Sequence, residues 1–407
     1  MSSPPEGRLD PHVLRRPSEL ARAPTPAPGQ LRRRPEPPHD GWPVGFVQTS
    51  RDRDALLVLL GLASLTPRRL LDAARSHGSF ERCLRAVRRG LVASPRDQEA
   101  ARSADAGAVA GRLDASGARM AVVHDPEYPA ALGDLFDPPA AIFIRGRDLR
   151  DLEPSVAMVG ARNCSAAGRE IAIELARALG AAGISVVSGA ARGIDAAAHR
   201  GALLGGAGTI AVLGSGIDVA YPRQHARLLD DITNAGAVVS EYPPGIRAEP
   251  FRFPARNRLV AALASAIVVV EGAPGSGSMI TADHALEIGR DVFAVPGSVS
   301  SELAAVPLAL IREGAGLIRG PHDLLSDLGL RPPAPEGKLE ERPFPGASDR
   351  DVVVWAAVGS CARPDEVARS AGISLPEAMA SLVALELRGL IRAVGGRYER
   401  RSVRRGD

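Results

Sequence analysis

Short apolar runs alternate with longer amphipathic segments through the middle of the chain. Most of the runs are rich in Val, Ile and Ala and end at Gly, Ser or Pro, which is typical of buried strands in a parallel sheet. They lie at residues 156–159, 184–187, 209–213, 237–240, 266–271 and 292–295. The segments between them carry apolar residues at helical spacing, as at Ile171, Leu175 and Leu179. The alternation predicts an α/β fold, a doubly wound, Rossmann-like parallel sheet with helices on both faces.

The chain before this sheet divides into a tail and a helical segment. Residues 1–50 are rich in Pro, with scattered charge and few large apolar residues, and we expect them to be disordered. Helical spacing begins near residue 55 and predicts three or four short helices in a small domain over residues 51–112. Apolar runs at residues 120–123 and 142–146 predict two further strands, so the sheet domain is expected to cover residues 113–330.

The chain after the sheet begins with a Pro-rich linker, residues 331–347. Helical patterns follow at residues 351–358, 364–371 and 376–390. The next residues read as a hairpin whose turn is Gly395-Gly396. Three helices and a hairpin predict a winged helix over residues 348–402. Its third helix could enter a DNA major groove or contact another protein.

Composition narrows the class of protein. The formal charge is only +3, so any nucleic-acid site must be a local patch. Cys83, Cys164 and Cys361 are far apart in the sequence, so we expect no disulfide, no metal site and no cofactor. No apolar run is long enough for membrane insertion, and the first residues lack the apolar core of a signal peptide. These features predict a soluble, cytoplasmic protein.

Two turns after predicted strands carry the chemistry of a phosphate site. The first contains Gly160 and Arg162, and the second contains Ser188, Gly189, Arg192 and Gly193. Each turn places backbone N–H groups and a guanidinium at the start of a helix, where the helix dipole favours an anion. The carboxyl ends of parallel strands meet at one edge of the sheet, so both turns should face one ligand.

Several stretches resemble the DNA-processing protein A family, also called DprA or Smf. They are VGAR at 159–162, SGAARGIDAAAH at 188–199, LGSGID at 213–218 followed by Tyr221-Pro222, FPARNR at 253–258 and SGSMIT at 276–281. The earlier Asp125–Pro129 and Asp137–Pro139 also match the family and are expected to be structural. The resemblance implies a protein that is not an enzyme. It would bind incoming single-stranded DNA, help load the RecA recombinase in natural transformation, and form homodimers.

The motifs define the candidate DNA-binding residues. Arg162 is the leading candidate, and Arg256 and Arg258 are expected to present two guanidiniums to adjacent phosphates. Phe251 and Phe253 are the candidates for base stacking, because aromatic residues make up only 3% of the chain. The full set is Gly160, Arg162, Ser188, Gly189, Arg192, Gly193, Arg223, Arg256, Asn257, Arg258, Ser276, Gly277 and Ser278. Asp195 and His199 are expected to be structural.

Two enzyme classes compete with this interpretation. PGSGSMIT at 274–281 looks like the PGGxGTxxE fingerprint of the lysine-decarboxylase-like (LOG) phosphoribohydrolases, but no Glu stands at the required spacing and the nearest acid is Asp283. A dinucleotide-dependent oxidoreductase is disfavoured because no GxGxxG follows the first strand. The chain also departs from the DprA pattern at Gly275 and at residues 306–308, both expected at the pocket rim.

Overall fold

The computed structural model describes residues 42, 46–47, 49–330, 348–358 and 362–400. Most of the tail expected over residues 1–50, the linker at 331–347 and the residues after 400 lie outside the described residues. The expected disorder is wrong for Trp42, which is buried and donates its Nε1–H to the carbonyl oxygen of Pro138 at 2.9 Å. The chain divides into two compact units, Met1–Pro332 and Pro333–Asp407, and each is taken by itself.

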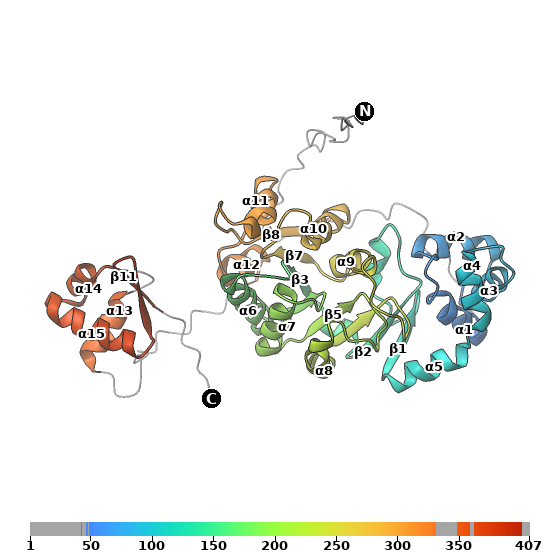
Figure 1. Ribbon diagram of the computed structural model, residues 1–407, viewed down its shortest axis with the longest axis horizontal. Coiled ribbons are helices and arrows are strands. Elements are labelled where there is room, and N and C mark those ends of the chain that lie inside the picture. Colours follow the sequence, from blue (N-terminus) through green and yellow to red (C-terminus); the bar gives the residue numbers. More distant parts are fainter. Residues whose placement is uncertain (1–41, 43–45, 48, 331–347, 359–361, 401–407) are drawn as a thin grey trace, which may run out of the picture. The chain divides into compact units, whose positions relative to one another are not determined.

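The first unit is built on a mixed sheet that is mostly parallel (Figure 1). Within residues 49–330 it has nine strands in the order β1-β2-β6-β5-β4-β3-β7-β8-β9. The strands are β1 (Ala118–Val122), β2 (Ala141–Gly146), β3 (Ser155–Val159), β4 (Ser185–Ser188), β5 (Thr209–Leu213), β6 (Ala237–Ser240), β7 (Ala266–Val269), β8 (Asp291–Ala294) and β9 (Gly316–Leu317). In this described sheet β3 to β9 run parallel, which confirms the predicted doubly wound architecture.

The two strands at one end of the sheet depart from the parallel pattern. β1 pairs antiparallel with β2, and β2 pairs antiparallel with β6. Parallel neighbours need a long crossover, usually a helix, whereas β1 and β2 are joined by a loop whose regular part is the short 3₁₀ turn Ala130–Asp134. The predicted extension of the sheet is therefore correct, and its strand direction follows from the missing crossover helix.

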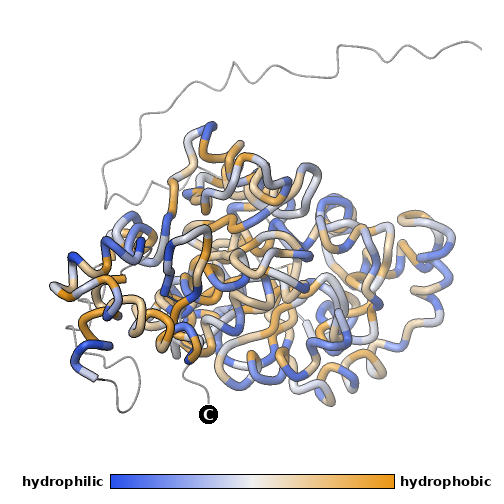
Figure 2. The backbone as a smooth tube through the Cα atoms, turned by 60° about the vertical axis from the view of Figure 1, so that its left-hand side comes forward, coloured by the Kyte–Doolittle hydropathy of each residue, from blue (hydrophilic) through white to orange (hydrophobic). Residues whose placement is uncertain are grey.

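Alternate residues of each strand supply two separate cores. In β3, Val156 and Met158 pack under α6, α7 and α12, while Ala157 and Val159 pack under α9, α10 and α11. Figure 1 shows α6, α7 and α8 on one side of the strands and α10 and α11 on the other, and Figure 2 shows hydrophobic segments running through the interior. The helices are α6 (Ala166–Ala181), α7 (Ile194–Gly205), α8 (Ala226–Ala235), α9 (Arg252–Ala262), α10 (Gly277–Glu287), α11 (Ala305–Arg312) and α12 (Pro321–Asp327).

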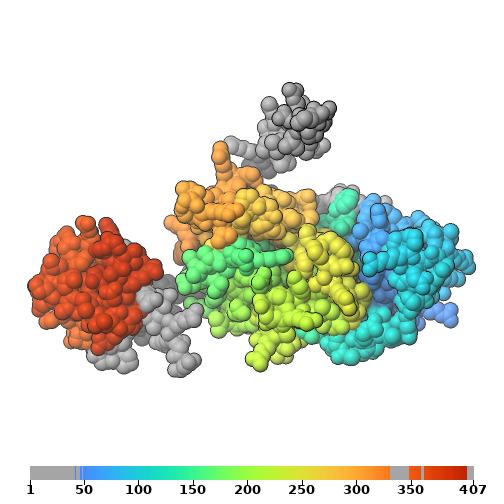
Figure 3. Space-filling view, viewed as in Figure 1, coloured from blue at the N-terminus to red at the C-terminus, as the bar shows by residue number. Residues whose placement is uncertain are grey.

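Five helices precede the sheet in the described residues. They are α1 (Ser50–Leu59), α2 (Pro67–His77), α3 (Phe80–Arg88), α4 (Pro95–Ser103) and α5 (Ala106–Ala115). Three or four helices were expected, so the structure has at least one more, and α5 runs through position 112, where a domain boundary was expected. Figure 3 shows these helices, blue to cyan, packed against the yellow segment that contains α9.

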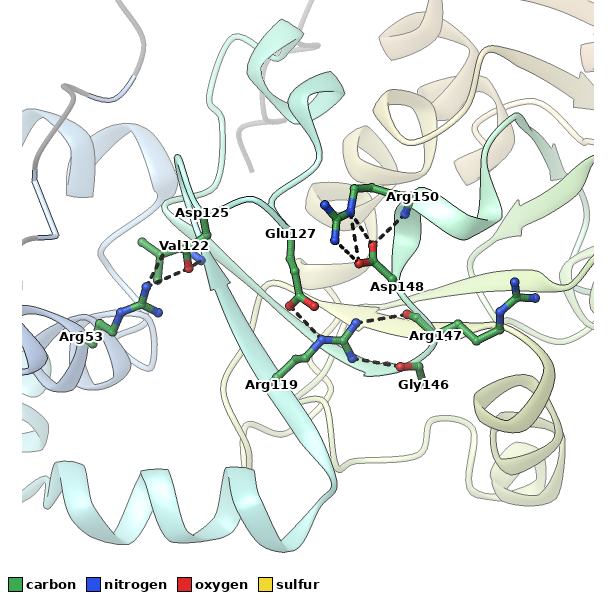
Figure 4. A network of polar contacts seen from close by, with 9 residues as sticks. All are labelled: Arg53, Arg119, Val122, Asp125, Glu127, Gly146, Arg147, Asp148 and Arg150. Carbon is green, nitrogen blue, oxygen red and sulfur yellow. Dashed lines mark hydrogen bonds and ion pairs between the residues drawn. The ribbon is translucent and has the colours of Figure 1, made fainter.

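Charged side chains tie these helices to the edge of the sheet (Figure 4). Arg53 of α1 donates two hydrogen bonds to Asp125, at 2.8 and 2.9 Å, and Asp125 also accepts the backbone N–H of Val122. Arg119 of β1 pairs with Glu127 at 2.9 Å. Asp125 therefore holds both a helix and a strand end, which supports the structural role expected for its motif.

The second unit is a winged helix, as predicted. The sequence Gly395-Gly396 forms the hairpin turn, with both residues at positive φ. No single helix in the described part of the chain is long and apolar enough to cross a membrane. The bent pair of α14 and α15, with 109° between the two helices, has the length and composition of a span only when both are taken together. The elements are α13 (Asp349–Val358), α14 (Pro364–Ala371), α15 (Leu375–Leu387), β10 (Ile391–Val394) and β11 (Arg397–Arg400).

Candidate nucleic-acid interface

A pocket of about 310 Å³ opens at the carboxyl ends of three adjacent strands. Arg162 follows β3, the Gly189–Arg192 turn follows β4, and Leu213 ends β5. This is the edge of the sheet at which doubly wound folds bind ligands. The lining residues are Arg162, Gly189, Ala191, Arg192, Leu213, Gly214, Tyr221, Pro222, Arg223, Gln224, Phe253 and Arg256.

One cation and two aromatic rings are stacked at the mouth of this pocket. The guanidinium of Arg162 lies over the ring of Phe253, with its Cζ 5.3 Å from the ring centroid. The rings of Phe253 and Tyr221 are 5.0 Å apart and tilted by 34°. Arg162 and Tyr221 are exposed. The arrangement offers an aromatic face for a planar base and a cation for a phosphate, the two elements of sequence-tolerant binding to a single strand.

The turn after β4 is shaped by its glycines. A Cβ at Gly189 would collide with the guanidinium of Arg256, and a Cβ at Gly193 would collide with the carbonyl oxygen of Ala161. Gly193 also has a φ of 79°, a conformation that side chains disfavour. These two glycines bring the turn close to both Arg256 and the end of β3.

Arg256 forms the floor of the pocket and does not extend from it. Its side chain is buried, and its Nη1 donates hydrogen bonds to the carbonyl oxygens of Gly189, at 2.6 Å, and of Val212. Burial lowers the pKa of Arg256 to about 10, and the nearby Asp195 opposes the shift. Burial likewise raises the pKa of Asp195, which accepts a hydrogen bond from the backbone N–H of Ala191 at 3.3 Å. This pair fixes the turn from below, in agreement with the structural role expected for Asp195.

Arg258 lies on the other side of α9 from Arg256. The expectation that Arg256 and Arg258 present two guanidiniums to adjacent phosphates is therefore wrong. It is buried and donates to both carboxylate oxygens of Glu241, at 2.7 and 2.6 Å, and it lies 3.4 Å from Asp137. Residues two apart on a helix are about 200° apart around its axis and cannot face one ligand. Arg258 therefore stabilises the packing between α9 and the Asp137–Pro139 segment.

Other candidates turn away from the pocket. The buried Ser188 donates its hydroxyl to the carbonyl oxygen of Met158 at 2.7 Å. Gly160 lies against Ile194 and leaves no room for a Cβ, so its role is close packing. These findings correct the expectation that both residues face a phosphate.

The SGS turn at the start of α10 also lies outside the pocket lining. Ser276 and Ser278 hydrogen-bond to each other at 2.7 Å, and Asn257 donates to the carbonyl oxygen of Gly277 at 3.0 Å. Asn257, one of the candidate DNA-binding residues, thus braces this turn and does not line the pocket. Gly275 and Val306 do not line the pocket either, so these departures from the family pattern leave its rim unchanged.

The structure therefore brings together Arg162, Gly189, Arg192, Arg223 and Arg256, and Gly193 lines the neighbouring cleft. None of the described residues that line the pocket is Asp or Glu, so its charge is positive. Sequence reasoning missed Tyr221 as a stacking residue and Gln224 as part of the wall. The sequence signal for both residues was the Tyr221-Pro222 pair after LGSGID, because this segment follows the end of a predicted strand.

Comparisons with known proteins identify the family of this chain. The family model described as DNA recombination-mediator protein A matches residues 119–329, about half of the chain. The chain belongs to this family. A second model, the DprA winged helix domain, matches residues 337–397.

Individual members of the family are similar over much of their length. The chain is 39% identical to Protein Smf of Escherichia coli over 285 residues, 67% of this chain and 75% of that protein. It is 44% identical to the DNA processing protein DprA of Streptococcus pneumoniae over 206 residues, 50% of this chain and 72% of that protein. The solved structure of Streptococcus pneumoniae DprA matches with a TM-score of 0.59 and 34% identity, over 68% of this chain and 98% of that one.

Proposed function

We propose that this chain binds single-stranded DNA at the Arg162 pocket and acts without catalysis in the processing of DNA. The observation that carries the proposal is the Arg162–Phe253–Tyr221 stack at the mouth of a positively charged pocket. An unpaired base can lie on the rings, and its phosphates can lie against Arg162, Arg192 and Arg223. Binding of this kind is independent of base sequence and strongly dependent on salt.

The family relationship supports the wider role. Members are named for DNA processing, so we propose that the bound strand is incoming DNA in the cytoplasm during natural transformation. Transfer of that strand to the RecA recombinase and assembly into homodimers belong to the same proposal. They rest on the resemblance alone.

The test is fluorescence anisotropy of a labelled oligothymidylate with the full chain across a salt series. Replacing Arg162 by Ala should weaken binding about tenfold or more, because a charge-assisted contact is lost, and should lower the salt slope by about 0.7. Replacing Phe253 by Leu should weaken binding by about 1–3 kcal/mol and leave the slope unchanged, because stacking releases no counterions.

Arg177→Ala is the matched control. This exposed arginine lies on α6 and lines neither the pocket nor its neighbouring cleft, so its loss should leave binding unchanged. Absence of single-strand binding by the wild type at low salt would refute the proposal. The nucleotide hydrolase alternative would then be tested by product analysis, although Asp283 lines neither cavity.

A further inference from the structure

A second cleft adjoins the Arg162 pocket. It measures about 510 Å³ and lies between the start of α6, the exposed side of α7 and the 3₁₀ turn Arg223–His225. It shares Arg162, Arg192 and Gln224 with the first pocket, so the two cavities meet along these side chains. Its lining comprises Arg162, Asn163, Cys164, Arg169, Arg192, Gly193, Ala196, Arg200, Gln224 and His225.

The charge of this cleft is uncompensated. Arg169 and Arg200 are exposed, and within the described residues neither side chain makes a hydrogen bond or an ion pair. The side chains of Arg192 and Arg223 also lack a partner among these residues, whereas Arg145 and Arg319 on the same unit pair with Asp230 and Asp323. Like charges this close together repel one another, and an anion between them would remove that cost.

Two carboxylates at the neighbouring helix starts are engaged in hydrogen bonds. Asp195 accepts the N–H of Ala191. Glu271 accepts both the N–H and the hydroxyl of Ser165, at 2.9 and 2.6 Å. Both carboxylates thus accept hydrogen bonds at the two helix starts. The described lining of the cleft holds no acidic side chain.

The second cleft differs from the first pocket in its aromatic residues. Phe253 and Tyr221 line the first pocket, while the described lining of the cleft has no Phe, Tyr or Trp. Its one ring, that of the buried His225, is held through Nδ1 by the carbonyl oxygen of Ala190 at 2.9 Å. The cleft therefore offers cations without a stacking surface, which suits a sugar–phosphate backbone and not a base.

We propose that the strand held at Arg162 continues into this cleft, where Arg169 and Arg200 bind its next phosphates. The inference rests on the proposed single-strand binding and extends it to a continuous path of two cavities. Bases stack in the first cavity, and the second holds only the backbone. Binding affinity should therefore depend on strand length.

The experiment compares labelled oligothymidylates of about 4 and about 16 nucleotides, the range of known single-strand site sizes, on the full chain. The double variant Arg169→Ala with Arg200→Ala should bind the long strand about tenfold or more weakly. It should lose about 1.4 from the salt slope, 0.7 for each phosphate, and bind the short strand as the wild type does. Arg169→Lys with Arg200→Lys should retain most of the long-strand affinity, and Arg177→Ala on the same helix should change nothing.

The outcomes separate this inference from the proposed function. In one outcome, the double Ala variant binds the long strand with the affinity and salt slope of the wild type while Arg162→Ala loses binding. That result would refute the role of the second cleft and leave the proposed function intact. An equal loss for both lengths would also overturn it, because the two arginines would then act on the first pocket. If the wild type binds neither strand, the proposed function itself fails.

Discussion

At the scale of single residues, the pocket depends on buried polar groups beneath its exposed side chains. The guanidinium of Arg256 donates hydrogen bonds to the carbonyl oxygens of Gly189 and Val212. Asp195 balances the charge of Arg256 and accepts a hydrogen bond from the backbone N–H of Ala191. Removing either partner alone leaves a buried charge, which costs about 3–5 kcal/mol. The exposed residues Arg162 and Phe253 are therefore better probes of DNA binding than Arg256, whose loss would also disturb the turn.

His199 gives a test of this buried layer through its pH dependence. Its Nδ1 lies 2.8 Å from the hydroxyl of Thr209, which itself donates to the carbonyl oxygen of Val186, so Nδ1 carries the proton. Its Nε2 is buried with no partner among the described residues. Burial, reinforced by Arg256, lowers the pKa of His199 to about 3, so the ring is neutral in the folded protein.

An unfolded histidine takes up a proton near pH 6.5, so the unfolded state binds more protons than the folded state below that pH. The free energy of unfolding should fall by up to about 1.4 kcal/mol per pH unit between about pH 6.5 and 3 through this group. His199→Asn, whose amide can donate to Thr209, should show a slope shallower by one proton in urea unfolding. Thr209→Ser should keep the wild-type slope. A wild-type slope in His199→Asn would assign the pH dependence to other groups.

At the scale of elements, α9 shows what sequence patterns could and could not predict. Phe253 and Arg256, three residues apart, face the Arg162 pocket, whereas Arg258 pairs with Glu241 outside it. Helical spacing alone could have separated Arg256 from Arg258, because residues two apart on a helix point to different sides. The strands, the crossover helices and the Gly395-Gly396 turn followed from local pattern. The direction of each polar side chain depends on tertiary partners such as Glu241, which no local pattern reveals.

The start of α6 illustrates the same point and gives a test. A phosphate was expected near this helix start, but the carboxylate of Glu271, just after β7, receives the N–H and the hydroxyl of Ser165. The acid holds the N-cap residue Ser165 and interacts with the helix dipole, so Glu271→Ala should lower the free energy of unfolding by about 1–2 kcal/mol in urea. Glu170→Gln, on the exposed side of the same helix, should change it by less than about 0.5 kcal/mol. Equal stability of Glu271→Ala and wild type would show that the carboxylate does not stabilise the start of α6.

At the scale of the whole molecule, the two units differ in the surfaces they offer to DNA. The first unit has the stacking pocket and the unpaired arginines. In the winged helix, α15 contains no Lys or Arg, and its exposed positions include Leu375, Val383 and Leu387, the last 83% exposed. An apolar face of this kind suits contact with a protein better than entry into a major groove, where readout depends on polar side chains.

The full chain should therefore bind a single strand about tenfold or more tightly than a blunt duplex of the same sequence. Only an unpaired base can lie on Phe253 and Tyr221, and that stacking term is absent for a closed duplex. Anisotropy competition measures the ratio directly, and a duplex with a central unpaired stretch should recover most of the single-strand affinity. The ratio should fall toward one in Phe253→Leu, because the remaining contacts are to phosphates that both forms present. Equal affinity of the wild type for strand and duplex would instead assign substantial DNA binding to the winged helix, and the apolar face of α15 would then lie outside that contact.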